Sequence, residues 1–202
     1  MKRITVALLA GAAVLGTQAN AAPKVPREPR TVVQVCSQCH GDRGLSTSPL
    51  FPNLAAQNKQ YLVTQLKDFR DHKRGDPHAQ AYMWGMAGRL TDSVIERVAT
   101  YFSALPAPPG DKTQNAAELA AGKEIFEKGI ASEQVPACAA CHGATGAGSA
   151  TIPRLAGQHR EYLATQLLAF RDNERRNNIM HANVVHITDQ QIRDISAYLA
   201  SL

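Results

Sequence analysis

The sequence has few aromatic residues. Its 202 residues include five Phe, five Tyr and one Trp, or 5% of the chain. Aromatic side chains fill much of a protein core, so this chain has few large residues with which to pack its interior. It is nevertheless 44% hydrophobic and only 19% charged, which is too apolar for a disordered protein.

A dedicated basic surface and a membrane-spanning run are also missing. The 22 Lys and Arg residues outnumber the 17 Asp and Glu residues, for a net charge of +5, and they are scattered along the chain. Charge alone does not exclude a nucleic-acid partner, but no basic stripe marks one, and the export signal described below makes such a partner unexpected. The apolar run near the N-terminus, residues 4–16, covers 13 residues, whereas a spanning helix needs roughly 20.

This apolar run predicts an export signal. Lys2 and Arg3 precede it, and Ala19-Asn20-Ala21 after it is a small-x-small cleavage site. Residues 1–21 are therefore predicted to be a cleavable Sec-type signal peptide, with the mature chain beginning at Ala22 and residing in the periplasm. An N-terminal anchor that is never removed is the alternative.

The two halves of the chain repeat each other. Residues 52–71 align without a gap to residues 153–172. Two copies of about 90 residues make a tandem of domains rather than a solenoid, which needs three or more repeats. Prolines between the copies end the preceding helix and favour an extended connector. The predicted boundaries are residues 22–105 for domain 1, residues 106–115 for the linker and residues 116–202 for domain 2.

Each copy is predicted to be helical. Apolar residues recur at helical spacing between Tyr61 and Phe69 and again between Tyr162 and Phe170. Thr91 and Thr188 are good N-cap residues for the last helix of each copy. We expect two further helices, from Ala116 to Lys128 and from Arg30 to Val35. No alternating strand pattern is present, so the predicted fold class is all-α.

Four cysteines form two motifs of the same kind, Cys36-Ser-Gln-Cys39-His40 and Cys138-Ala-Ala-Cys141-His142. C-x-x-C-H is the attachment signature of c-type haem. Two thiols three positions apart on a helical turn can form thioethers with the two vinyl groups on one haem edge, and the histidine then projects towards the iron. We therefore predict two covalently bound haem c groups, with His40 and His142 as proximal iron ligands.

Other readings of a C-x-x-C pair are less consistent with this sequence. A thioredoxin-like dithiol needs a βαβ setting, which is missing here. A four-cysteine zinc site would need the two pairs to meet, yet they occupy equivalent places in two repeats. A disulfide within each pair would not require the histidine that follows.

Methionine sulfur is the usual sixth ligand of haem iron in an electron carrier, where it raises the reduction potential. Met180 is the one methionine of the second repeat, and it lies eight residues before Thr188. Met83 lies eight residues before Thr91, so the register selects Met83 over Met86. His181, His186, His78 and His72 are rival ligands, and His181 beside Met180 keeps a bis-histidine alternative open.

Two prolines are predicted to orient the haem ligands. Pro52 follows His40, and Pro153 follows His142, by 12 and 11 residues respectively. A rigid loop at each proline could present a backbone carbonyl to the histidine Nδ1–H, which would fix the imidazole and make it more basic. A simple turn proline is the alternative.

The pattern resembles the dihaem cytochromes c4 over nearly the whole mature chain. The first copy carries the resemblance in Cys36-x-x-Cys39-His40-Gly41, Pro52-Asn-Leu-Ala-Ala-Gln57, Met83 and Leu90-Thr91-Asp92. The second copy carries it in Cys138-x-x-Cys141-His142-Gly143, Pro153-Arg-Leu-Ala-Gly-Gln158, Met180 and Ile187-Thr188-Asp189.

The resemblance implies two class I cytochrome c domains, each wrapped around one covalent haem. It implies thioether attachment through Cys36, Cys39, Cys138 and Cys141, and axial ligation by His40 with Met83 and by His142 with Met180. Gly122 looks like the glycine of an N-terminal helix that packs against an aromatic residue of the last helix, here Tyr198. The first copy departs from this pattern, since it lacks such a glycine and has four more residues between Phe69 and Met83, so equal haem potentials are not expected.

The function implied is periplasmic transfer of single electrons between a redox protein donor and acceptor, towards a terminal oxidase or from a membrane quinol-oxidising complex. Such a carrier has no catalytic residues and is not an enzyme. The alternatives are a dihaem subunit of a flavoprotein or other periplasmic dehydrogenase, and a dihaem peroxidase with an open iron position. The sequence leaves peripheral membrane association open.

Overall fold

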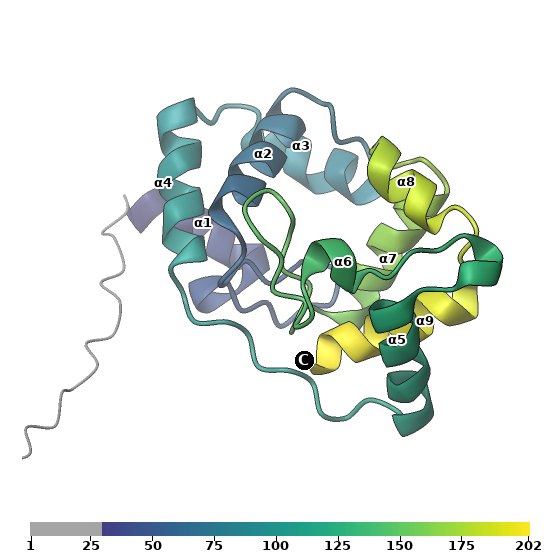
Figure 1. The fold of residues 1–202 in the computed structure, drawn as a ribbon. Helices are drawn as coiled ribbons and strands as arrows, with labels where there is room; N and C mark the ends of the chain where they lie inside the picture. Colours follow the sequence, from purple (N-terminus) through teal and green to yellow (C-terminus); the bar gives the residue numbers. More distant parts are fainter. Residues whose placement is uncertain (1–29) are drawn as a thin grey trace, which may run out of the picture.

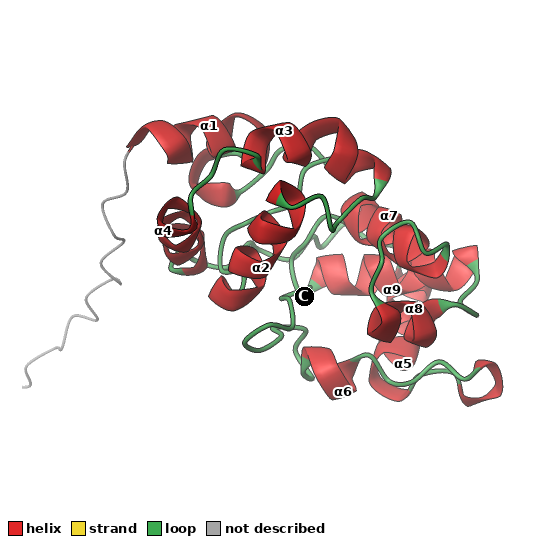
Figure 2. Cartoon of the chain, turned by 90° about the horizontal axis from the view of Figure 1, so that it is seen from above, coloured by secondary structure: helices red, strands yellow, loops and turns green. Residues whose placement is uncertain are grey.

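The structure is a computed structural model that describes residues 30–202, and it consists of two helical halves (Figure 1). The helices of the first half occupy one side of the molecule and those of the second half the other, with the C-terminal end of the chain near the middle. Helices and loops make up both halves (Figure 2). Within residues 30–202 the β-structure is limited to two isolated bridges, so the all-α prediction is confirmed.

The predicted signal peptide, residues 1–21, and the first residues of the predicted mature chain lie outside the described residues. In the first half the helical elements are α1 (Arg30–His40), η1 (Asp42–Gly44), α2 (Lys59–Arg70), η2 (Ala79–Met83), α3 (Trp84–Ala87) and α4 (Asp92–Ser103). In the second half they are α5 (Ala116–Lys128), η3 (Ala131–Glu133), α6 (Ala139–His142), α7 (Arg160–Arg171), α8 (Asn178–Val184) and α9 (Asp189–Ser201).

The predicted threonine is the N-cap of the last helix in each half. The Thr91 side chain accepts a hydrogen bond from the Val94 backbone N–H at the start of α4. At the start of α9, Thr188 and Gln191 form a reciprocal capping box. These bonds satisfy backbone donors that the first helical turn would otherwise leave unpaired.

Each half has its own hydrophobic core. The apolar residues of α4 and α9 that face inward are buried: Ile95, Val98, Ala99 and Phe102 in α4, and Ile192, Ile195, Ala197 and Leu199 in α9. Phe102 is fully buried in the first core, and Phe126 is fully buried in the second. The remaining core positions are mostly aliphatic, which agrees with the shortage of aromatic residues.

In the second half, α5 crosses α9 at a glycine. A Cβ atom on Gly122 would lie 2.0 Å from the Asp194 carbonyl oxygen and 2.9 Å from the Tyr198 Cβ. Only a residue without a side chain permits this approach. Phe126 on α5 then contacts Tyr198, with ring centroids 5.6 Å apart. The contact implied by the family resemblance is therefore confirmed.

The longer methionine loop of the first half contains the π-helical element η2, which ends at Met83. The corresponding segment of the second half is the regular helix α8. Single π-helical turns inside helical segments occur often at functional sites. The four additional residues therefore change the local backbone that carries Met83.

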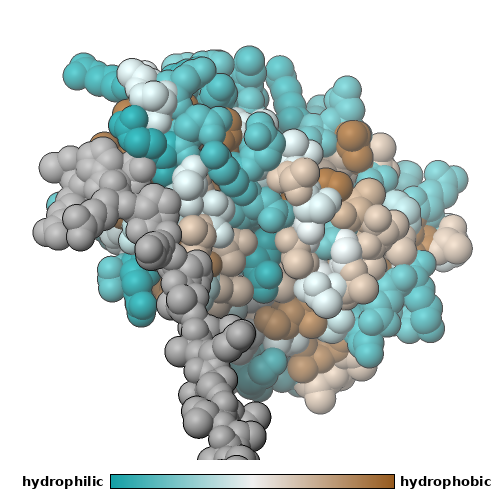
Figure 3. All heavy atoms as spheres, turned by 60° about the vertical axis from the view of Figure 1, so that its left-hand side comes forward, coloured by the Kyte–Doolittle hydropathy of each residue, from teal (hydrophilic) through white to brown (hydrophobic). Residues whose placement is uncertain are grey.

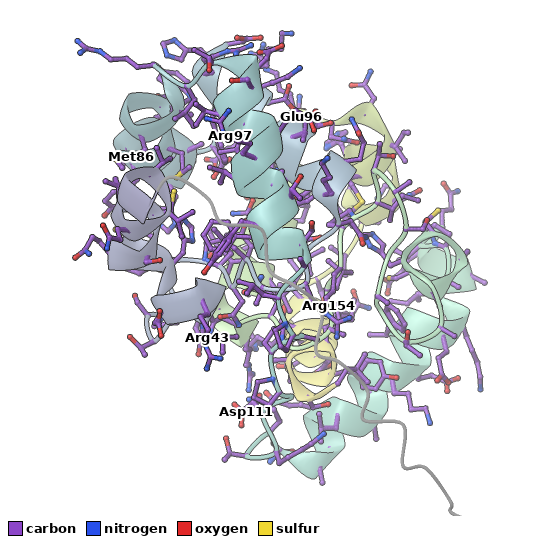
Figure 4. All side chains as sticks on the ribbon, turned by 90° about the vertical axis from the view of Figure 1, so that its left-hand side faces the viewer. Arg43, Met86, Glu96, Arg97, Asp111 and Arg154 are labelled. Carbon is purple, nitrogen blue, oxygen red and sulfur yellow. The ribbon has the colours of Figure 1, made fainter. Side chains whose placement is uncertain are left out.

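The connector between the halves lies against the end of α9. The Asp111 backbone N–H donates to the Ala200 carbonyl at 2.8 Å, and Asp111 is seen at the lower edge of the molecule in Figure 4. Gly110 approaches the Ser201 carbonyl so closely that a Cβ atom would clash with it. Pro108 in the same segment is buried.

On the face seen in Figure 3, hydrophilic side chains cover the top and the right edge, and apolar and weakly polar residues cover much of the middle and lower part. Among residues 30–202, the helices are all too short or too polar to cross a membrane.

Candidate functional site

The two motif histidines lie at the ends of equivalent helical turns. His40 is the last residue of α1 and His142 the last of α6, and each is only 7% exposed. The chain leaves both helices through a glycine with positive φ, 78° at Gly41 and 77° at Gly143. This left-handed conformation is one that glycine adopts without strain, and it lets the chain turn away from the imidazole.

Both imidazoles contact the predicted prolyl carbonyl. His40 Nδ1 lies 2.9 Å from the Pro52 oxygen, and His142 Nδ1 lies 3.1 Å from the Pro153 oxygen. A carbonyl oxygen can only accept, so Nδ1 carries the proton and donates it in both halves. The Nε2 lone pair is then left to bind a metal, and the predicted orienting bond is confirmed in each copy.

Burial favours the neutral form of both histidines. Desolvation lowers the pKa of His40 and of His142, and the bonds to the prolyl carbonyls offset this only in part. Neutral imidazole is the form that coordinates a metal ion. The electrostatics of the two positions therefore match the predicted role.

No disulfide joins the four cysteines. Cys36 and Cys138 are half-buried, and Cys39 and Cys141 are exposed. Burial raises the pKa of Cys36, and it raises the pKa of Cys138 to about 11. Reactive dithiols have a lowered pKa instead. Within residues 30–202 no three His, Cys, Asp or Glu residues gather as a metal-ion site, so the zinc alternative has no support there.

Met83 and Met180 both face apolar surroundings in their own half. Met83 packs against Phe69, Ala79 and Ala87, and Met180 packs against the second core. Met86 is 49% exposed. These environments agree with the register argument that chose Met83.

Aromatic contacts connect the histidine and methionine segments of the first half. The rings of His40 and Phe51 are 6.1 Å apart, and the rings of Phe51 and Tyr82 are 5.3 Å apart. Tyr82 directly precedes Met83. Through Phe51, the structure therefore connects the Met83 segment to the end of α1, which carries His40.

Three of the four rival histidines make contacts within their own halves. His72 stacks on Trp84 with ring centroids 4.1 Å apart, and His78 meets the edge of Tyr82. His181 Nδ1 lies 2.9 Å from the Phe170 carbonyl oxygen. The ring contacts of His72 and His78 place both side chains in packing roles in the first half. The His181 bond resembles those of His40 and His142 in leaving Nε2 free, so the bis-histidine alternative beside Met180 stays open.

Sequence reasoning missed two buried arginines between the halves. Arg74 and Arg175 are each 7% exposed, and each guanidinium lies over the phenylalanine five residues before it, at 4.6 Å from Phe69 and 4.5 Å from Phe170. The equal spacing from those phenylalanines was the available sequence signal. It could reveal an equivalent pair, but not that the two side chains meet.

Two glutamine oxygens bridge the arginines across the halves. Gln65 Oε1 accepts from Arg74 Nη1 at 2.8 Å and from Arg175 Nη2 at 2.6 Å. Gln166 Oε1 accepts from Arg74 Nη2 at 2.6 Å and from Arg175 Nη1 at 2.7 Å. Asp76 contacts the pair as well, since its Oδ2 accepts from Arg74 Nε at 2.8 Å.

This cluster fits a cofactor that carries carboxylates. Two buried guanidiniums lie beside one buried carboxylate, which leaves positive charge to be balanced in a place where water does not reach it. The Gln166 Nε2 donor is also buried and has no hydrogen-bond partner among the described residues. A haem carries two propionates, so the donor set and the charge of this region suit it.

Comparison with known proteins agrees with this chemistry. A protein-family model described as cytochrome c matches residues 29–106 and, a second time, residues 119–202. Among curated relatives, cytochrome c-552 of Acidithiobacillus ferridurans is 41% identical over 175 residues, or 86% of this chain and 76% of the relative. Cytochrome c4 of Pseudomonas aeruginosa is 36% identical over 83% of this chain and 84% of the relative.

A further relative is named for its redox partner. The thiosulfate dehydrogenase electron acceptor of Stutzerimonas stutzeri is 32% identical over 83% of this chain and 78% of the relative.

Two solved structures of cytochrome c4 share the fold. The structure from Acidithiobacillus ferrooxidans has a TM-score of 0.80 and 40% identity, and it covers 84% of this chain and 99% of its own. The reduced recombinant protein from Pseudomonas stutzeri has a TM-score of 0.76 and 33% identity, with coverages of 86% and 96%.

The relatives are electron-transfer proteins by name, and this chain is likewise an electron-transfer protein rather than an enzyme. Its two cytochrome c domains and two C-x-x-C-H motifs bind two covalent haem c groups. The chain therefore belongs to the cytochrome c family, as a tandem, dihaem member of the cytochrome c4 type.

Proposed function

We propose that this dihaem carrier moves single electrons between respiratory partners in the periplasm, towards a terminal oxidase or from a membrane quinol-oxidising complex. The observation that carries the proposal is the pair of buried, neutral histidines whose Nδ1 atoms are held by prolyl carbonyls at 2.9 Å and 3.1 Å. In this proposal the iron ligands are His40 with Met83 in the first half and His142 with Met180 in the second.

The chain's own residues hold, orient and shield the cofactors. Cys36, Cys39, Cys138 and Cys141 form the thioethers, which fix each haem in a small domain with long loops. The prolyl carbonyls orient the imidazoles and increase their basicity, and methionine sulfur favours reduced iron. When bound, each haem iron supplies one-electron exchange.

Export belongs to the same proposal. A signal peptide at residues 1–21 would deliver an unfolded chain to the periplasm, where the thioethers form. The mature protein would then comprise domain 1 at residues 22–105, the linker at residues 106–115 and domain 2 at residues 116–202.

The purified protein tests the electron-carrier role directly. Haem staining of a denaturing gel should give a coloured band, because thioether-bound haem survives denaturation. A potentiometric titration should show two one-electron steps, and the ferric protein should show the weak long-wavelength band of methionine-ligated haem c. A colourless band would overturn the proposal.

A dehydrogenase subunit is the second candidate, and the relative that serves as a thiosulfate dehydrogenase electron acceptor favours it. Two rate measurements separate the candidates. Membrane vesicles that contain a terminal oxidase should oxidise the reduced carrier rapidly if the first proposal is correct. Slow oxidation by the vesicles, together with rapid reduction by a co-purifying dehydrogenase, would favour the second.

A further inference from the structure

The peptide unit that contacts each haem ligand is also bonded from the other half of the molecule. The Pro52 carbonyl accepts from His40, and the N–H of the same peptide unit, that of Asn53, donates to Gln158 Oε1 at 2.8 Å. The second half repeats the arrangement. The Pro153 carbonyl accepts from His142, and the Arg154 N–H donates to Gln57 Oε1 at 2.7 Å.

Each glutamine holds its target with a second bond. Gln158 Nε2 donates to the Asn53 carbonyl at 3.0 Å, and Gln57 Nε2 donates to the Arg154 carbonyl at 2.9 Å. Both glutamines are only 7% exposed, and Asn53 is 8% exposed. Arg154 lies where the two halves meet in Figure 4. The contacts therefore form a reciprocal pair across the interface, buried at Asn53 and half-buried at Arg154.

Hydrogen bonds at the two ends of a peptide unit reinforce each other. A peptide whose N–H donates to an acceptor has a more negative carbonyl oxygen, and in a low-dielectric interior such polarisation strengthens the next bond in the chain. Gln158 thus makes the Pro52 oxygen a stronger acceptor for His40, and Gln57 does the same for His142. The second bond, to the carbonyl of the same residue, also holds the backbone of Asn53 and of Arg154 in place.

We propose that Gln158 is a positioning residue for His40 and Gln57 for His142, so that each half tunes the haem of the other half. This inference rests on the proposed ligand roles of His40 and His142. A stronger bond at Nδ1 makes the imidazole a better electron donor, which stabilises ferric iron. Loss of Gln158 should therefore raise the potential of the first haem, and loss of Gln57 that of the second.

Gln158→Leu and Gln57→Leu test the proposal, because leucine keeps most of the volume and removes both bonds. The potential of each haem is followed by NMR during a redox titration, with signals assigned through the Nδ1–H resonances of His40 and His142. We expect Gln158→Leu to raise the potential of the first haem by roughly 30 mV relative to that of the second. At 59 mV per tenfold, this shifts the electron-exchange equilibrium between the haems about threefold towards reduction of the first haem. In the reduced protein the His40 Nδ1–H resonance should move upfield.

Gln57→Leu is expected to give the mirror result, at the second haem and at His142. The effect of each glutamine on the haem of the opposite half is called the relay. Because the two substitutions lie in different halves, either variant measures the relay if the other does not fold. A structural disturbance would act first on the half that carries the substitution, whereas the relay acts on the opposite half. A shift confined to the haem of the substituted half, or no shift at either haem, would overturn the proposal.

His159→Leu is the matched control. His159 is the neighbour of Gln158, and its Nε2 lies 3.0 Å from the Ser46 carbonyl oxygen across the same interface. The substitution removes an interface bond without touching the prolyl peptide, so the two potentials should keep their difference.

The wild-type protein separates failure of the proposed function from failure of the relay. If it lacks histidine–methionine haems, the proposed function fails, and if it has them but the leucine variants leave the opposite haem unchanged, only the relay fails.

Discussion

A histidine that must face a haem iron needs a fixed ring and a neutral charge. At His40 both come from local features, since burial lowers its pKa and the Pro52 carbonyl accepts a hydrogen bond from its Nδ1–H. Gly41 follows with φ of 78°, and a Cβ atom there would lie 1.8 Å from the Leu45 carbonyl oxygen. The glycine after the motif is thus required by the turn and not by the haem chemistry.

Substitution of the two first-half methionines should separate ligand from surface residue. Met83→Ala should abolish the long-wavelength ferric band of one haem, because Met83 packs inside the first half. Met86→Ala should leave both haems unchanged, because Met86 is 49% exposed. Absorption spectra of the two oxidised variants check this, and the reverse pattern would contradict the assignment.

Asp76→Asn should destabilise the protein and flatten its acid response. Burial alone would raise the pKa of Asp76, but the charge and hydrogen bond of Arg74 outweigh it, so the pKa lies below its ordinary value. The stability that this carboxylate contributes is fully present above its unfolded pKa of about 3.9, and it is lost as the pH falls through the folded pKa. Removing one partner of such a buried pair costs about 3 kcal/mol at pH 7.

Denaturant titrations at pH 7 and below pH 4 measure both effects. Asp71→Asn is the control, since Asp71 pairs with Arg70 at the exposed surface and its loss should change stability much less. Equal losses of unfolding free energy in the two variants at pH 7 would show that the buried Arg74–Asp76 pair stabilises the protein no more than the exposed pair does.

At the scale of elements, the two halves differ in how their helices support the motif. The second half is organised by the crossing of α5 over α9. In the first half, the single helix α1 both packs into the hydrophobic core and carries the C-x-x-C-H motif. Val33 on α1 packs into the first core, and His40 ends the same helix. In the second half, α5 supplies the core contacts and the short helix α6 supplies His142. The two haem ligands are therefore supported by different arrangements of helices.

Gly122→Ala should force α5 away from α9. A Cβ atom would lie 2.0 Å from the Asp194 carbonyl oxygen, which backbone shifts must relieve, so we expect a loss of about 2 kcal/mol or more. Thermal unfolding of the purified variant measures this. Gly85→Ala is the control in α3, where a Cβ atom meets nothing within 4 Å, and replacing glycine within a helix should stabilise the protein by about 0.5 kcal/mol. A neutral effect at Gly122 would contradict the close crossing.

At the scale of the whole molecule, the interface between the halves is polar and buried. It combines the glutamine contacts to Asn53 and Arg154 with the arginine pair bridged by Gln65 and Gln166. Buried polar groups are costly unless they are paired. The two halves can therefore separate only with a loss of many bonds at once.

This interface should make the two halves unfold together. Calorimetry of the wild-type protein is expected to show one cooperative transition. The double substitution Gln57→Ala with Gln158→Ala removes four interface bonds, worth roughly 4 kcal/mol in total at about 1 kcal/mol each, and should split the transition into two. Two transitions in the wild-type protein, or one in the double variant, would contradict this prediction.

Local patterns were enough to predict much of the fold and the site. The cysteine–histidine motifs, the capping threonines and the helical stripes act within a few turns of the chain, so their spacing carries their meaning. The Pro52 and Pro153 contacts were also predictable, because the same spacing recurs in both copies and the carbonyl has only one role towards an imidazole N–H.

The sequence by itself therefore determined the helical class, the tandem arrangement, the haem attachment motifs and the residues that could face the iron. Only the tertiary structure decided where the polar residues that recur in both copies would bind. Gln57 and Gln158 recur in register, yet the repeat does not show whether each contacts its own half or the other, and the same holds for Arg74 and Arg175. The physical reason is that these contacts join residues about a hundred positions apart, and their partners depend on how two folded halves dock, which no local pattern encodes.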